Sequence, residues 1–445
     1  MADQPHVLFI NTDQLRPDFL SCYGFPVQTT PHIDALAAEG VRFVHAYTQC
    51  PICVPARYSL TTGEYVSSHG ATSNRHAPYP TQRSLLETFN DNGYHTVAVG
   101  KLHHNPPDQS FGFQEVHLHD GTFPNRRPFS EYSAWLQQEG VDEDDLCYAA
   151  DVDDVPEKAR LKDKLHWGRC RLPDAYCEST FLADRAIRFV RAYDRDAPVF
   201  LYLSFVAPHS PYCPPAPYDT LFDPADMPVP PREDEDQMNR KHRAIRALRD
   251  DRYGPEGLSD AVIADVRAQY AGLVAHLDHH VGRAVEAFRE RFGGDAIVCF
   301  TSDHGDLLGE HYQCEKHMQY EGATRIPYIV CRPGHVPGGV VADALAEQID
   351  MFPTVLGLSG AAWDATSVAG CDRSAGILAG QPDGPEYVFS ENWDSPGPHV
   401  HYFAMARSRT HKCAVILDKD RSRPPVWELY DLVDDPNEVD NIADD

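Results

Sequence analysis

Apolar runs and amphipathic helical segments alternate along most of this chain. The runs at 6–10, 198–205 and 295–301 are mostly apolar, which is typical of parallel β-strands covered on both faces. Between them, segments such as 175–193 and 259–292 place apolar residues at helical spacing. The pattern therefore predicts an α/β fold with parallel strands between layers of helices.

The pattern changes after about residue 362. A passage rich in Gly, Ser and Asp leads into short segments that alternate as strands do, at 386–390, 401–407 and 412–417. Short strands of this kind suit a small antiparallel sheet. We therefore predict a larger domain over residues 1–362 and a smaller C-terminal α+β domain over residues 363–445.

The charge balance limits the partners that this protein can bind. The 445 residues include 39 basic and 67 acidic side chains, for a net charge of −28, which disfavours nucleic acid and anionic membrane surfaces. No apolar run has the length needed to span a bilayer. An anionic substrate would therefore need a local basic pocket.

The N-terminal residues and the cysteines indicate the cellular compartment of the protein. Residues 1–5 lead directly into the first predicted strand, without the pattern of a signal peptide. The twelve cysteines are scattered and form no spacing framework, so we expect reduced thiols. Together these features predict a cytoplasmic protein.

Polar residues follow several of the predicted strands. Asp13 follows the first strand, Lys101 and His103 follow the strand at 95–100, and Asp303 and His304 follow the strand at 295–301. Open α/β sheets bind their ligands at the carboxyl ends of parallel strands. Alternate residues of an extended segment share a face, so Lys101 and His103 can point into the same cleft.

The stretch at 49–63 ends a strand and opens a short helix, with Cys53 at the junction. Pro55 suits the first turn of a helix, which places residue 53 at a helix N-terminus, an environment that favours anions. Arg57 lies one turn further on. Cys50 and Cys53 also have the spacing of a redox pair or of half a zinc site, although no second close pair of cysteines accompanies them.

Histidines gather in the segment predicted as a long helix over 259–292. His276, Asp278, His279 and His280 are close in sequence, but only His276 with His279 or His280 shares a helix face. We therefore interpret these side chains as structural.

Residues 53–57 read Cys-Val-Pro-Ala-Arg. This Cys-x-Pro-x-Arg motif resembles the sulfatase family of the alkaline phosphatase superfamily. The resemblance implies an alkaline phosphatase-like α/β fold, with one large mixed, mostly parallel sheet between helices. It also implies the oxidation of Cys53 to Cα-formylglycine by a formylglycine-generating enzyme. In the hydrated aldehyde, one hydroxyl can attack sulfur and the other can expel the sulfate.

Further motifs extend the resemblance to most of the chain. Gly-Lys-x-His at 100–103, the histidine loop at 207–212, the run that contains Lys316 and the C-terminal segment at 428–432 all resemble sulfatase motifs. The resemblance assigns the substrate anion to Lys101, His209 and Lys316. It lets His209 or Lys316 assist the departing oxygen, makes His103 the base at residue 53, and lets Arg57 hold that residue in place.

Two assignments depart from the sulfatase pattern or leave an alternative open. Asn74 lies in a polar loop that contacts substrate or is simply solvated. The resemblance implies a divalent metal held by Asp13, Gln14, Asp303, His304 and an oxygen of the modified Cys53. Sulfatases usually have an Asp where Gln14 stands. Oxygen ligands suit Ca²⁺, whereas an imidazole favours Mn²⁺, and the sequence leaves both open.

Two enzymatic activities fit these residues. The first is a sulfatase that hydrolyses a small-molecule or carbohydrate sulfate ester, most similar in motif to the bacterial branch with choline sulfatases and phosphonate monoester hydrolases. The alternative is a phosphonate monoester or phosphodiester hydrolase on the same scaffold. A redox or metal-binding protein that uses Cys50 and Cys53 is a remote third hypothesis. The alcohol part of the substrate and a homo-oligomeric state are left open.

Overall fold

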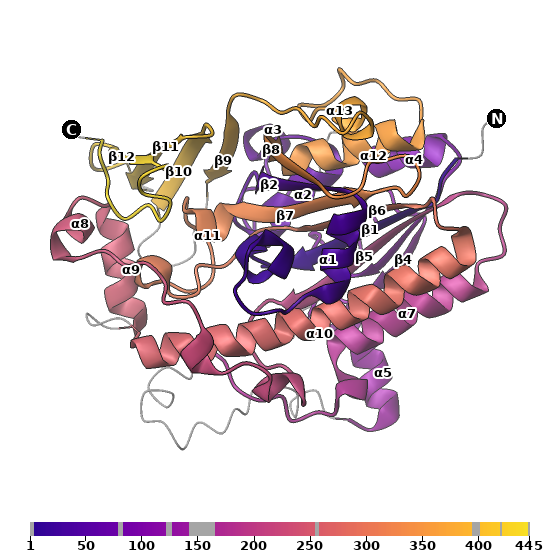
Figure 1. The fold of residues 1–445 in the computed structure, drawn as a ribbon, viewed down its shortest axis with the longest axis horizontal. Helices are drawn as coiled ribbons and strands as arrows, with labels where there is room; N and C mark the ends of the chain where they lie inside the picture. Colours follow the sequence, from indigo (N-terminus) through magenta and orange to yellow (C-terminus); the bar gives the residue numbers. More distant parts are fainter. Residues whose placement is uncertain are drawn as a thin grey trace.

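The computed structural model describes residues 4–78, 83–121, 127–141, 165–253, 258–393, 401–418 and 421–443. Two sheets organise this part of the chain, a large one at the centre and a small one near the C-terminus (Figure 1). In the described ranges, no helix is both long and apolar enough to span a bilayer.

The central sheet has eight strands in the order β4-β3-β5-β1-β6-β7-β2-β8. Strand β7 runs antiparallel to both of its neighbours, whereas the other pairs are parallel. The strands are β1 Val7–Asp13, β2 Val41–Tyr47, β3 His95–Gly100, β4 Glu115–Leu118, β5 Val199–Pro208, β6 Ile297–Ser302, β7 Arg325–Cys331 and β8 Val340–Glu347. The prediction of a mixed, mostly parallel sheet is confirmed.

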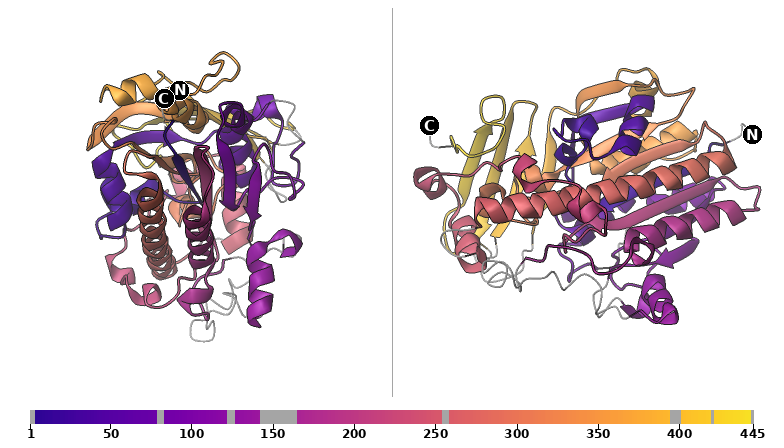
Figure 2. Two further views of the ribbon diagram at one scale, coloured as in Figure 1. Left: turned by 90° about the vertical axis from the view of Figure 1, so that its right-hand side faces the viewer. Right: turned by 60° about the horizontal axis from the view of Figure 1, so that its bottom comes forward.

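Helices cover both faces of this sheet. On one face lie α1 Pro31–Glu39, α7 Glu178–Ala192 and α10 Asp260–Phe292. On the other face lie α2 Cys53–Thr62, α4 Leu85–Asp91 and α12 Met351–Ser359. Helices α7 and α10 run side by side, close to the strands (Figure 2).

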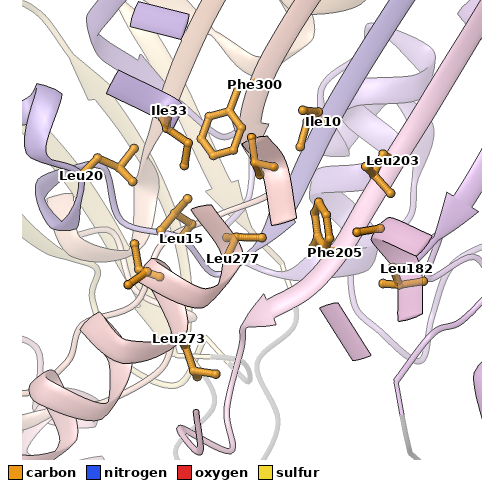
Figure 3. Close-up of a cluster of buried hydrophobic side chains, with 14 of the residues drawn as sticks. Ile10, Leu15, Leu20, Ile33, Leu182, Leu203, Phe205, Leu273, Leu277 and Phe300 are labelled. Carbon is orange, nitrogen blue, oxygen red and sulfur yellow. The ribbon is translucent and has the colours of Figure 1, made fainter. Parts of the chain in front are cut away.

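The apolar runs are buried on both faces, as their composition predicts. Leu8 and Ile10 of β1 pack into the core beneath α7 and α10, whereas Val7 and Phe9 pack into the core on the opposite face. Figure 3 shows the first of these cores, in which strand residues such as Phe300 meet side chains from the helices. Successive side chains of a strand point to opposite faces, so one run of apolar residues supplies both cores.

Shorter helices connect or flank these layers. They are α3 Val66–His69, α5 Glu131–Glu139, α8 Glu235–Asn239, α9 Arg243–Tyr253, α11 Glu321–Thr324 and α13 Ser374–Leu378.

The small antiparallel sheet has the order β12-β11-β10-β9. Its strands are β9 Val388–Asn392, β10 His401–Arg407, β11 His411–Asp418 and β12 Val426–Asp431. Buried and half-buried residues alternate along β10, and Phe403 and Met405 share a small core with Tyr47 and Leu345 of the central sheet. The prediction of a short antiparallel sheet near the C-terminus is confirmed, whereas the division into domains over residues 1–362 and 363–445 stays a prediction.

Candidate active site

Four neighbouring parallel strands deliver polar side chains to one edge of the sheet. In the order β3-β5-β1-β6, these strands end next to one another. Asp13 is the last residue of β1, Lys101 follows β3, His209 follows β5, and Asp303 and His304 follow β6. Because parallel strands share a direction, their carboxyl ends lie at the same edge, where open α/β sheets bind ligands.

A glycine turns the chain at the end of β3. Gly100 has a φ of +102°, and a Cβ atom there would overlap the carbonyl oxygen of Ser204. A residue with a side chain would therefore be strained and would clash with β5. This close approach lets the backbone N–H of Lys101 donate to the same carbonyl oxygen at 2.9 Å.

Cys53 is the first residue of α2, as the position of Pro55 predicts, and it is buried. The helix N-terminus is capped from outside, because the backbone N–H of Val54 donates to Asn74 Oδ1 at 3.0 Å. Asn74 is half-buried. This side chain therefore contacts the helix that carries Cys53.

Asp13, Cys53, Asp303 and His304 converge on one point. One ligand atom from each lies within 4.8 Å of those of the others, and all four side chains are buried. Cys53 Sγ lies 3.2 Å from His304 Nε2 and 3.8 Å from Asp13 Oδ1. Residues up to 291 positions apart in the sequence therefore build one cluster.

The tautomer of His304 is fixed by a backbone contact. Its Nδ1 lies 2.9 Å from the carbonyl oxygen of Gly305, which can only accept, so Nδ1 carries the proton. In the neutral form of the ring, the lone pair of Nε2 points toward Cys53 and the two carboxylates. This is the arrangement that a metal-binding histidine needs.

Arg57 links the cluster to the surrounding strands. Its Nε donates to Asp303 Oδ2 at 2.9 Å and its Nη2 donates to Asp13 Oδ2 at 3.1 Å. Its Nη1 donates to the carbonyl oxygen of Lys101 at 2.7 Å and to Ser204 Oγ at 2.9 Å. One buried guanidinium therefore holds two carboxylates and the ends of β3 and β5.

Two lysines reach different members of the cluster. Lys101 Nζ lies 2.6 Å from Asp13 Oδ2, and Lys316 Nζ lies 3.1 Å from Cys53 Sγ. Lys316 also donates to Gln14 Oε1 at 2.7 Å. Both lysines are buried, so their charges act with little screening by solvent.

These cations favour the anionic forms of Asp13 and Cys53. Burial and Cys53 raise the pKa of Asp13, but Lys101, His209 and Lys316 lower it well below its usual value. Burial also raises the pKa of Cys53, yet Lys316, Lys101 and His304 bring it well below that of an ordinary thiol. The site is therefore built to hold negative charge, although the whole protein is acidic.

The remaining ionisable groups shift in other directions. Burial and the charge of Asp13 raise the pKa of Asp303. Burial, together with Lys101, lowers the pKa of His103 to about 4, against a favourable hydrogen bond with Cys53. His103 Nδ1 has no hydrogen-bond partner among the described residues. At neutral pH this imidazole is uncharged and able to take a proton.

Gln14 adopts a left-handed backbone conformation with a φ of 69°. Its side-chain nitrogen donates to Asp306 Oδ2 at 2.5 Å and its oxygen accepts from Lys316. Tyr212 Oη donates to the same oxygen of Asp306 at 2.6 Å. The amide thus lies beside the cluster and is held by Asp306 and Lys316.

Asp306, Tyr212 and Ser204 support the site but were not singled out from the sequence. Asp306 stands three residues beyond Asp303, close enough to have been noticed. Tyr212 and Ser204 carried no such signal, because their partners Asp306 and Arg57 are distant in the sequence.

His209 lies in the wall of a cavity that Lys101 also lines. Its Nδ1 lies 2.6 Å from the carbonyl oxygen of Ser210, so Nδ1 carries the proton and Nε2 is available to a ligand. Tyr132, Val206 and Leu273 give the cavity an apolar side. The cavity therefore joins a cationic region to an apolar one.

Sequence comparison identifies the family to which this arrangement belongs. The profile described as Sulfatase matches residues 5–361. The chain belongs to the sulfatase family. A second profile, described as N-sulphoglucosamine sulphohydrolase, C-terminal, matches residues 309–445.

Individual relatives agree with this assignment. An arylsulfatase of Clostridium perfringens is 30% identical, with 79% of this chain and 74% of that protein covered. A choline-sulfatase of Rhizobium meliloti is 24% identical, with 99% and 83% covered. A phosphonate monoester hydrolase of Silicibacter pomeroyi superposes with a TM-score of 0.81 at 26% identity, with 99% and 92% covered.

Membership in this sulfatase family makes the chain a sulfuric ester hydrolase. The predicted resemblance and its bacterial branch are confirmed. Cys50 and Cys53 are both free thiols, and burial, Glu391 and Cys53 raise the pKa of Cys50 well above its usual value. A protonated, buried Cys50 is a poor partner for redox chemistry.

Proposed function

We propose that this sulfatase hydrolyses small-molecule or carbohydrate sulfate esters with residue 53 as its nucleophile. The proposal rests on one observation: Cys53 stands at the N-terminus of α2, among two carboxylates, an imidazole and two lysines. A formylglycine-generating enzyme would first oxidise Cys53. The hydrated aldehyde would supply one hydroxyl for attack on sulfur and a second for release of the sulfate.

The donor set at this edge fits a divalent metal ion. Asp13, Asp303 and the Nε2 lone pair of His304 face one point, and Gln14 adds an amide oxygen nearby. We propose that these residues, with an oxygen of modified residue 53, hold Ca²⁺ or Mn²⁺. When bound, such an ion supplies Lewis-acid polarisation of the substrate anion.

Basic side chains would bind the sulfate group. Lys101 and Lys316 bring two buried charges to Cys53 and Asp13, and His209 presents Nε2 from the cavity wall. Fixed donors in a site that excludes water stabilise charge better than water does. We assign the substrate anion to Lys101, Lys316 and the imidazolium form of His209, whose Nε2–H would face the ligand, with His209 or Lys316 protonating the departing alcohol oxygen.

His103 and Arg57 would act on residue 53 itself. His103 is uncharged at neutral pH and forms a hydrogen bond with Cys53, which suits a base that takes a proton from residue 53. Arg57 ties Asp13 and Asp303 to the ends of β3 and β5. It would therefore hold the residues around the nucleophile in place.

The decisive experiment compares the native enzyme with Cys53→Ala. We expect peptide mass spectrometry to show an aldehyde at residue 53 of the native enzyme, and turnover of an aryl sulfate to fall at least about 100-fold in the variant. Metal-stripped enzyme should regain activity with Ca²⁺ or Mn²⁺. Full activity of Cys53→Ala, or a Cys50–Cys53 disulfide in the active enzyme, would contradict the proposal.

Hydrolysis of phosphonate monoesters is a second candidate activity. The Silicibacter pomeroyi phosphonate monoester hydrolase covers 99% of the chain at 26% identity. Both kinds of ester carry one negative charge, so the basic residues alone do not separate them. The ratio of kcat/KM for an aryl sulfate to that for the matching aryl phosphonate monoester decides, and we expect the sulfate to be preferred.

A further inference from the structure

A second group of metal-ligating side chains lies outside the Cys53 cluster. Asp174, His276 and His280 bring one ligand atom each within 4.8 Å of the others. Both histidines lie on α10 and are buried. Asp174 belongs to the short 3-10 helix at 174–176 that precedes α7. The sequence alone indicates structural histidines here, because the third ligand, Asp174, lies on a separate element and is distant in the sequence.

The three ligand atoms are close together. His276 Nε2 lies 3.0 Å from His280 Nε2 and 2.7 Å from Asp174 Oδ1, and His280 Nε2 lies 3.9 Å from that oxygen. Zinc binds nitrogen and oxygen at about 2.0–2.2 Å, so two ligands of a tetrahedral site lie about 3.3 Å apart. The three separations bracket this value.

The spacing of the histidines also suits zinc. His276 and His280 are four residues apart on one helix, and two histidines at this spacing present their rings on one face, as in helical zinc sites. Thr180 Oγ1 lies 3.0 Å from His280 Nε2 and donates to Asp174 Oδ1 at 2.9 Å. A hydroxyl therefore completes the ring of polar atoms around the site.

We propose that Asp174, His276 and His280 form a zinc site where α7 and α10 meet. This site is separate from the Cys53 cluster, since neither α7 nor α10 contributes to that cluster. His276 also lines the cavity that contains Lys101 and His209, so the zinc ion lies in the cavity wall. With three protein ligands, one coordination position is left for water or a ligand.

Arg283 opposes the binding of zinc to His280. Its Nη1 donates to His280 Nδ1 at 3.1 Å, which leaves the proton of a neutral His280 on Nε2. Zinc needs the lone pair of Nε2, so Arg283 must move away from the ring, and its charge repels the ion. Arg283 Nη2 also binds Asp184 at 2.6 Å, a partner that it can keep.

Zinc content measured by inductively coupled plasma mass spectrometry tests the site in the full-length enzyme. The native protein and His279→Gln should each hold one more zinc ion than His280→Gln and Asp174→Asn. His279 is the matched control, because it is exposed and lies outside the cluster. Zinc at the Cys53 cluster is common to all four proteins and cancels in the comparison.

Titration with zinc gives the second measurement. Loss of one ligand should weaken binding at least about 100-fold, whereas Arg283→Met should tighten it about tenfold or more, since the opposing charge and the bond to Nδ1 are removed. Co²⁺ should give visible absorption bands in the native protein that are absent from Asp174→Asn. Equal zinc content in all variants would overturn the proposal.

Folding is checked in the same experiment. Circular dichroism and the thermal midpoint are recorded without metal for each variant. If His280→Gln is unstable, Asp174→Asn decides, because the Asp174 side chain is 44% exposed and is tolerant of substitution. Retention of the additional zinc ion by folded Asp174→Asn and by His276→Gln would also refute the site.

Discussion

Replacing Arg57 tests whether this guanidinium positions the residues of the active site. In Arg57→Met, Asp13 keeps Lys101 at 2.6 Å, but Asp303 Oδ2 loses its partner at 2.9 Å. The hydrogen bonds to Ser204 Oγ and to the carbonyl oxygen of Lys101 are also lost. The buried carboxylate of Asp303 then lacks its ion pair with Arg57, while its Oδ1 still accepts from the backbone N–H groups of Gln14 and His304.

The magnitude follows from these contacts. Removal of one partner of a buried ion pair costs about 3–5 kcal/mol. The free energy of unfolding is about 5–15 kcal/mol for a typical protein, so the variant should still fold. Arg57→Lys keeps the charge but reaches fewer of the four acceptors, and we expect a loss of about 1–3 kcal/mol.

Activity should fall further than stability alone explains. Asp13 and Asp303 flank Cys53, and a displacement of about 1 Å in a catalytic group can cost about 100-fold in rate. We therefore expect kcat of Arg57→Met to fall by about that factor at a temperature where the variant is folded. Because Arg57 belongs to the Cys-x-Pro-x-Arg motif, its replacement can also change how much of residue 53 is oxidised. Rates are therefore normalised to the fraction of residue 53 that carries the aldehyde.

Arg16→Met is the matched control. Arg16 is also buried and pairs with Asp18 at 2.7 Å and with Glu310 at 2.5 Å. Among the described residues, its hydrogen bonds and ion pairs do not involve Asp13, Cys53, Asp303 or His304. Urea unfolding should give a comparable loss of stability, with a much smaller loss of kcat. Equal losses of kcat in the two variants, or an unchanged kcat in Arg57→Met, would refute the positioning role.

Two further predictions follow from local contacts. Asn74→Ala should lower the free energy of unfolding by about 1 kcal/mol, because the backbone N–H of Val54 loses its acceptor. Asn74→Asp keeps an acceptor oxygen and should not lower it. A rise in KM at unchanged stability in both variants would instead support contact of Asn74 with substrate. His69 is buried, and burial lowers its pKa to about 4, below the value of about 6.5 for an unfolded histidine. The unfolded chain therefore takes up a proton as the pH falls from about 6.5 to 4, and stability is lost over that interval. The stability advantage of the native protein over His69→Gln should shrink between about pH 7.5 and pH 5 in urea titrations, and a constant difference would contradict this account.

Much of the fold and of the site could be predicted from the sequence because their signals are local. Apolar runs mark strands buried on both faces, and polar residues directly after them mark the ligand-binding edge. Asp13, Lys101, Asp303 and His304 are brought together at that edge because parallel strands end on the same side. The Cys-x-Pro-x-Arg motif identified the family through a contiguous run of residues.

Only the tertiary structure decided which side chains of the site contact one another. Gln14 turns toward Asp306 and Lys316, and the side-chain oxygen of Asn74 accepts from the backbone N–H of Val54 and so caps the helix that carries Cys53. Asp174 joins two histidines that lie 102 and 106 residues away in the sequence. No periodicity encodes contacts of this kind, because they depend on how separate elements pack and on the side-chain orientations that packing allows.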